Sequence, residues 1–182
     1  MKDLIYISCL VLIISFTNCH DPNRIRIKPG IGIDDISFEH SEPEDIFNYK
    51  GLYYSVREGT GHADGYDFSC YDNWKKYTFD NLGITFTFST PCVENPDTFK
   101  LEFVNISLVN TPNAYLKNGI GIGKSKYEDV IKIYGKPSED WENESFLSYD
   151  SPKIDFSFNE EGILYWVKIF RRNKKSKKRS EK

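Results

Sequence analysis

The sequence predicts an α+β fold of two tandem repeats, in each of which a short capped helix precedes a three-stranded antiparallel meander and packs on it, helix on sheet. Three observations support this prediction. The heptapeptides IKPGIGI at 27–33 and LKNGIGI at 116–122 are nearly identical. A helix-start signal of the form S-x-x-E follows each of them. Segments in which apolar and polar residues alternate, as in half-buried strands, come after each helix signal.

Each predicted helix has a start signal and an end signal. In a capping box S-x-x-E, the serine oxygen accepts a hydrogen bond from the third helical N–H, and the glutamate side chain accepts one from the serine N–H. A glycine after about two turns suits the left-handed residue that commonly ends a helix. The residues concerned are Ser41, Glu44 and Gly51 in the first half, and Ser125, Glu128 and Gly135 in the second.

The predicted strands follow turn signals and a two-residue period. Ile84, Phe86 and Phe88 alternate with threonines, which indicates a sheet with one buried and one solvated face. An aromatic content of 15% also favours strands. We therefore place the first repeat at 27–110 and the second at 111–170. The expected strands are 74–79, 84–89 and 99–109 in the first repeat, and 145–149, 154–158 and 163–170 in the second.

The N-terminus has the pattern of an export signal. The apolar run at 4–16 follows Lys2 and is too short to cross a membrane, which takes about 20 residues. Cys19 and the polar residues after it give a pattern that resembles the signal of bacterial lipoproteins. The resemblance implies a signal peptide at 1–18, acylation of Cys19 with palmitate-type chains, and a tether at 19–26. An uncleaved anchor or plain secretion, with Cys19 a bystander, stays open.

A second resemblance concerns the fold. The stretch GIGKSKYEDVIKIYGKPSED at 121–140 is similar to the helix-opening signature of two related groups of proteins. These are the small lipoproteins that accompany the outer-membrane barrel-assembly machinery, and the tandem fold of secreted β-lactamase inhibitor proteins. The resemblance covers roughly 27–170 and implies the fold alone, because proteins of one fold differ widely in function. The matching positions are Gly123, Ser125, Val130, Gly135 and Pro137.

One loop, at 57–73, contains the residue types of a chemical site. His62, Asp64, Asp67 and Cys70 are the types that bind a metal or form an acid–base pair. A metal site usually needs three or four converging ligands, and the mature chain has no second cluster of His or Cys. We therefore expect a solvated loop, and we expect no catalytic residue, no metal and no cofactor.

A disulfide between Cys70 and Cys92 is expected. If residues 80–83 close a hairpin that pairs Phe79 with Ile84, the two cysteines come within one residue of facing each other. Disulfides persist in exported proteins, and one that closes a loop of this length stabilises the fold by about 3 kcal/mol. Two buried thiols are the alternative.

Charge is distributed unevenly along the chain. The tail at 171–182 has eight basic residues and one acidic residue, so it carries +7 and the rest of the chain carries −10. An acidic body argues against binding to nucleic acid, because that affinity comes largely from clustered Lys and Arg. We expect the basic tail to be disordered, and contact of the tail with anionic lipid is the alternative.

These observations predict a lipid-anchored protein of the bacterial cell envelope, at the outer rather than the inner membrane, that acts as a non-enzymatic protein-binding or scaffold module. Exposed aromatic residues would contact the protein partner, because such residues dominate interface energetics. An inhibitor of a secreted hydrolase, binding through the loop at 59–68, is the second hypothesis, and an enzyme is the third. The partner-binding candidates are Trp141, Tyr149, Tyr165 and Trp166, unless they fill the core.

Overall fold

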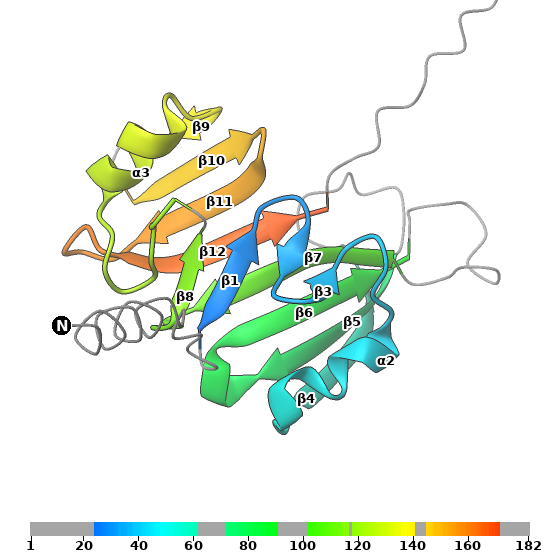
Figure 1. The fold of residues 1–182 in the computed structure, drawn as a ribbon. Coiled ribbons are helices and arrows are strands. Elements are labelled where there is room, and N and C mark those ends of the chain that lie inside the picture. The colour runs from blue at the N-terminus through cyan, green and yellow to red at the C-terminus, as the bar shows by residue number, and fades with distance from the viewer. Residues whose placement is uncertain (1–23, 62–71, 91–101, 117, 141–144, 172–182) are drawn as a thin grey trace, which may run out of the picture.

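A computed structural model describes residues 24–61, 72–90, 102–116, 118–140 and 145–171 (Figure 1). The large sheet consists of β4 (Ser55–Gly61), β5 (Asp72–Phe79), β6 (Ile84–Ser89), β7 (Glu102–Val109), β9 (Glu139–Asp140), β10 (Phe146–Asp150), β11 (Lys153–Phe158) and β12 (Leu164–Phe170). These strands are antiparallel and lie in the order β4-β5-β6-β7-β12-β11-β10-β9. The two halves of the chain therefore meet at β7 and β12, in the middle of one sheet.

The small sheet contains parts of both GIGI heptapeptides. Its strands are β1 (Ile25–Lys28), β2 (Gly32–Ile33), β3 (Ile36–Ser37) and β8 (Ala114–Leu116), in the order β3-β2-β1-β8. β1 pairs antiparallel with β2 and parallel with β8. At Gly32 a Cβ would lie 1.9 Å from the carbonyl oxygen of Ile36, so β2 approaches β3 in a way that only glycine permits.

The helical elements and the small sheet cover the same face of the large sheet, which we call the inner face (Figure 1). The covering helical elements are α2 (Pro43–Ile46), the 3₁₀ turn η2 (Tyr49–Gly51) and α3 (Tyr127–Tyr134), whereas the 3₁₀ turn η3 (Asp80–Leu82) connects β5 to β6. The ring of Tyr49 lies 5.3 Å from that of Phe86, and the ring of Tyr134 lies 5.4 Å from that of Phe156. No described helix is both long and apolar enough to cross a membrane.

The core lies between this covering layer and the large sheet. Strand residues alternate between the two faces, so every second side chain of the central strands points into the core. The opposite face of the large sheet, which we call the outer face, takes the remaining side chains. The fully buried inner-face residues include Phe79, Ile84, Phe86, Ile106, Leu108, Phe156, Val167 and Ile169.

The predicted α+β fold of two helix-and-meander repeats is wrong. The described chain is mostly β, with an eight-stranded and a four-stranded sheet, and α2 has only four residues. Four strands of the large sheet follow each helix, not three, because β4 and β9 extend the sheet at its two edges. The strands also do not form two separate meanders, since the pairing of β7 with β12 satisfies backbone groups that would otherwise form two open edges.

The hairpin of β5 and β6 is confirmed. Phe79 pairs with Ile84, as the turn signal at 80–83 predicts, and the register continues to Trp74 and Ser89. A left-handed Gly83, with φ of 65°, follows the turn. The pairing is local, so the sequence between the strands determines it.

The predicted serine capping boxes are wrong, because both helices begin one residue later. In each helix the N-cap N–H donates to an aspartate carboxylate three residues on, at 2.8 Å in α2 and 2.9 Å in α3. The serine Oγ instead accepts from the backbone N–H four residues earlier, at 3.0 and 3.1 Å, and so holds the chain before the helix. The pairs are Glu42 with Asp45, Lys126 with Asp129, Ser41 with Ser37, and Ser125 with Gly121.

Candidate functional site

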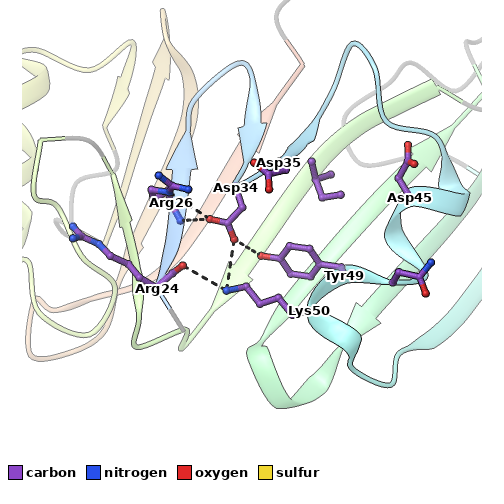
Figure 2. Close-up of a pocket in the computed structure, with 9 residues that line it drawn as sticks. Arg24, Arg26, Asp34, Asp35, Asp45, Tyr49 and Lys50 are labelled. Carbon is purple, nitrogen blue, oxygen red and sulfur yellow. Dashed lines mark hydrogen bonds and ion pairs between the residues drawn. The ribbon is translucent and has the colours of Figure 1, made fainter. Parts of the chain in front are cut away.

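A hollow of about 350 Å³ lies between β1, the turn after β2 and the α2–η2 segment (Figure 2). Its lining residues all lie between positions 24 and 50. Three cationic and three anionic side chains line it, so the formal charge of the lining sums to zero. The charged lining residues are Arg24, Arg26, Lys50, Asp34, Asp35 and Asp45, and the others are Ile36, Asn48 and Tyr49.

Asp34 is the centre of the charged cluster in this hollow. Its Oδ1 accepts a hydrogen bond from the backbone N–H of Arg26 at 2.9 Å, and its Oδ2 accepts one from the Tyr49 hydroxyl at 2.9 Å (Figure 2). The ammonium of Lys50 lies 3.7 Å from Oδ2. Both oxygens of Asp34 therefore have partners within the protein.

Tyr49 is held in its protonated form. Burial raises the pKa of Tyr49, and the charge of Asp34 and the hydrogen bond to Asp34 raise it further. Its ring packs edge-on against Phe79 and Phe86, with centroids 5.6 and 5.3 Å away. At neutral pH the hydroxyl is a hydrogen-bond donor and has little capacity to act as a base or a nucleophile.

The cluster around Asp34 is best explained as a joint between the two sheets. Asp34 belongs to the turn after β2, while Tyr49 and Lys50 belong to η2. The ring of Tyr49 packs on Phe79 of the large sheet, so η2 is attached to that sheet. Asp34 and Lys50 both have left-handed backbones, with φ of 46° and 53°. The hydrogen bonds and the ion pair offset the cost of those conformations. The described residues contain no group of three or more His, Cys, Asp or Glu placed to hold a metal ion.

The outer face of the large sheet is the second candidate. No described helix or strand packs on it (Figure 1), and the aromatic side chains that point from it are half-buried. The cross-strand row of Val109, Trp166, Ser157 and Phe146 follows directly from the register. The aromatic residues of the outer face are Trp74 on β5, Phe146 on β10, and Trp166 and Phe170 on β12.

Neighbouring polar groups hold these rings in place. The indole N–H of Trp166 donates to the hydroxyl of Ser107 at 2.7 Å. The ammonium of Lys76 lies 5.0 Å from the Trp74 ring, and that of Lys168 lies 5.1 Å from the Phe170 ring. Such cation–π contacts order both groups. The outer face is therefore a broad surface of fixed aromatic rings among lysine, serine and threonine side chains.

The predicted partner-binding residues are distributed over different environments. Trp166 lies on the outer face, and Tyr165 is half-buried next to the register shift between β11 and β12. Tyr149 is 5% exposed in the core, and its hydroxyl donates to the Gly135 carbonyl at 3.0 Å, so it is unavailable to a partner. Its Cα partner is Ile154, an inner-face residue, which explains the burial. Trp141 lies outside the described residues.

Several other predicted features also lie outside the described residues. They include Cys19 with the signal peptide, the loop residues His62, Asp64 and Asp67, the basic residues 172–182, and both Cys70 and Cys92. Of the proposed inhibitory loop at 59–68, the structure describes only the end of β4.

The sequence did not reveal the outer face as a site, although most of its residues lie in predicted strands. In β5 the aromatic residues lie at both even and odd positions, so Trp74 points to one face and Tyr77 and Phe79 point to the other. The alternation of residues along the sequence therefore does not show which of these rings is buried. Pairing with Ile84 and Phe86 of β6 resolves it, because these side chains are fully buried.

The comparisons with known proteins give no match. The chain matches no protein-family model, no curated protein and no solved structure.

Proposed function

We propose that this protein is a lipid-anchored module of the bacterial cell envelope that binds a protein partner, without catalysis, through the outer face of its large sheet. One observation carries the proposal: four described aromatic side chains are half-buried, and so partly accessible, on a sheet face on which no described element packs. Sheet faces of this kind are normally covered or polar, and exposed aromatic surface often marks an interaction site.

The make-up of the outer face favours a protein as the partner. Protein interfaces combine aromatic anchors with a polar rim, and Trp is among the residues that most often carry binding energy. Trp166 and Trp74 are anchors of this type, and a cross-strand row of hydroxyl residues, Thr78, Thr85 and Ser107, lies between their rows on the outer face. The Asp34 hollow gives less support to a ligand, because its central carboxylate is already bonded on both oxygens.

The proposed anchor places this surface near a membrane. Arg24, the first described residue, is five positions after Cys19, so the chain between their Cα atoms spans at most about 18 Å. An acylated Cys19 would therefore keep the sheets next to the bilayer, and the partner would be a protein of the envelope, at the outer rather than the inner membrane. Labelling with a palmitate analogue tests the anchor: wild-type protein should be labelled and Cys19→Ser should not.

Site-specific photo-cross-linking in intact cells tests the binding surface. A photoreactive residue at Thr85 or Lys168, both on the outer face, should give one discrete cross-linked product. The same residue at Lys132, which is exposed on α3, should give none. Products from Lys132 alone, or from all three positions equally, would contradict the proposal.

A further inference from the structure

The strand β4 forms one edge of the large sheet. Its residues Ser55–Gly61 pair only with β5, and no described strand pairs with its other side. Such an edge presents free backbone N–H and C=O groups to which another strand can add. β4 contains no proline, and one of its two charged residues, Glu58, is paired with Lys75 at 3.2 Å.

On the inner side, the apolar layer continues to this edge and remains exposed there. Val56 is 44% exposed although its Cα partner Tyr77 is 2% exposed. Phe47 is 40% exposed and stacks on Tyr54 with ring centroids 5.6 Å apart. A strand added beside β4 would cover Val56 and Phe47, provided that it carried an apolar side chain opposite Val56.

On the outer side, Arg57 is directly opposite Lys76. Like charges in this position repel each other, and neither residue forms an ion pair with a carboxylate among the described residues. The indole of Trp74 lies over Gly59, where a Cβ would be 2.8 Å from its Cζ2 atom, so the ring extends across β4 to the edge. An acidic side chain opposite Arg57 would neutralise the repulsion.

The β4 strand of a second copy of this chain does not supply that acidic residue. If two β4 strands pair antiparallel with their outer faces aligned, Arg57 can lie opposite only those β4 residues whose side chains also point to the outer face. Those residues are Ser55, Arg57, Gly59 and Gly61, none of which is acidic. The other described edge strand, β9, is acidic, but its two residues, Glu139 and Asp140, include no apolar side chain to lie beside Val56. The added strand therefore comes from a different protein.

We infer that the partner adds an extended strand to β4 in which apolar and acidic residues alternate, the apolar side chain lying beside Val56 and the acidic one beside Arg57. This inference rests on the protein-binding function proposed above. It goes beyond that function because it specifies the edge, the backbone conformation and the side-chain pattern of the partner.

Two synthetic peptides test the inference with the full-length protein in detergent. One is a short peptide of alternating Glu and Val, and the other has Lys in place of Glu. Fluorescence anisotropy should show binding of the Glu peptide, about tenfold stronger than that of the Lys peptide. Hydrogen exchange should slow in Ser55–Gly61 when the Glu peptide is bound. Arg57→Glu should reverse the preference, whereas Lys132→Glu, the same charge change on α3, should leave it intact.

Equal affinity for the two peptides, or unchanged exchange in β4, would overturn the inference. So would protection of β4 that depends on protein concentration without any peptide, because that result would identify a second copy as the occupant. The cross-linking test distinguishes this outcome from failure of the broader function. If strand addition fails while Thr85 and Lys168 still give a discrete product, a partner binds the outer face without using the edge.

Discussion

Ile27 and Leu116 are Cα partners in the parallel pair of β1 and β8, and their residue numbers differ by 89, the offset at which the two GIGI heptapeptides align. The near-identical peptides therefore lie side by side in the small sheet. Both also contain a glycine in a close approach: Gly32 to the Ile36 carbonyl, and Gly121 to the ring of Tyr115. The repeated sequence therefore corresponds to the ends of two paired strands, β1 and β8, and to the turns that follow them.

Gly32→Ala should lower the free energy of unfolding by about 2–3 kcal/mol, because its Cβ would overlap the Ile36 carbonyl and force the backbone to shift. Gly119→Ala is the control: nothing lies within 4 Å, and only its positive φ of 89° opposes alanine, at about 1 kcal/mol. Urea unfolding measures both. Equal losses would show that the close approach of β2 to β3 is not required.

Asp34→Asn should lower the free energy of unfolding by about 1–3 kcal/mol. The substitution removes the negative charge that pairs with Lys50, and it weakens the hydrogen bond that the carboxylate accepts from the Tyr49 hydroxyl. Asparagine keeps the size of the side chain and tolerates the left-handed backbone. Asp35→Asn changes an exposed neighbour and should stay within about 0.5 kcal/mol of wild type. Similar effects of the two changes would argue against a joint at Asp34.

Alkaline pH should destabilise the protein through Tyr49. The folded-state pKa of Tyr49 is raised above the unfolded value of about 10, so the unfolded chain loses this proton first. The free energy of unfolding therefore falls as the pH rises above about 10, and the contribution is fully present below it. In Tyr49→Phe the decline between pH 9 and 11 should be shallower by up to about 1.4 kcal/mol per pH unit. Tyr53→Phe, at a 95% exposed position, should leave the decline unchanged.

The disulfide between Cys70 and Cys92 remains a prediction, and the described hairpin supports its register. Thr90 N–H donates to the Asn73 carbonyl at 2.9 Å, which extends the β5–β6 pairing toward both cysteines. Thiol alkylation of the denatured protein, before and after reduction, should show a gain of two reactive thiols. An unchanged count would establish free thiols instead.

Local features of the fold could be predicted from the sequence, and long-range pairings could not. The turn at 80–83 and the alternation around Phe86 were enough to predict the β5–β6 hairpin and its register. Nothing local indicates that β7 pairs with β12, since either strand would suit an edge equally well. β4 also escaped prediction, because its glycines and charges have low strand propensity and its conformation depends on pairing with β5.

The candidate site could likewise be predicted only in part, because it depends on long-range pairing. Trp166 was predicted as a contact residue and lies on the outer face, but Tyr149 was grouped with it and is buried. The pairing of Tyr149 with Ile154 would have separated the two, had the strand register been known. The cluster around Asp34 contains residues from β1, the turn after β2 and η2. No spacing in the sequence predicts that these residues contact one another.

Hydroxyl-radical footprinting tests the central claim, partner binding by the outer face, most directly. Side-chain oxidation is compared between intact cells and the purified protein. Trp74, Phe146, Trp166 and Phe170 should be protected in cells and become reactive on purification, whereas Tyr53, 95% exposed, should react in both. Equal oxidation of the four outer-face rings in cells and in the purified protein would contradict the account.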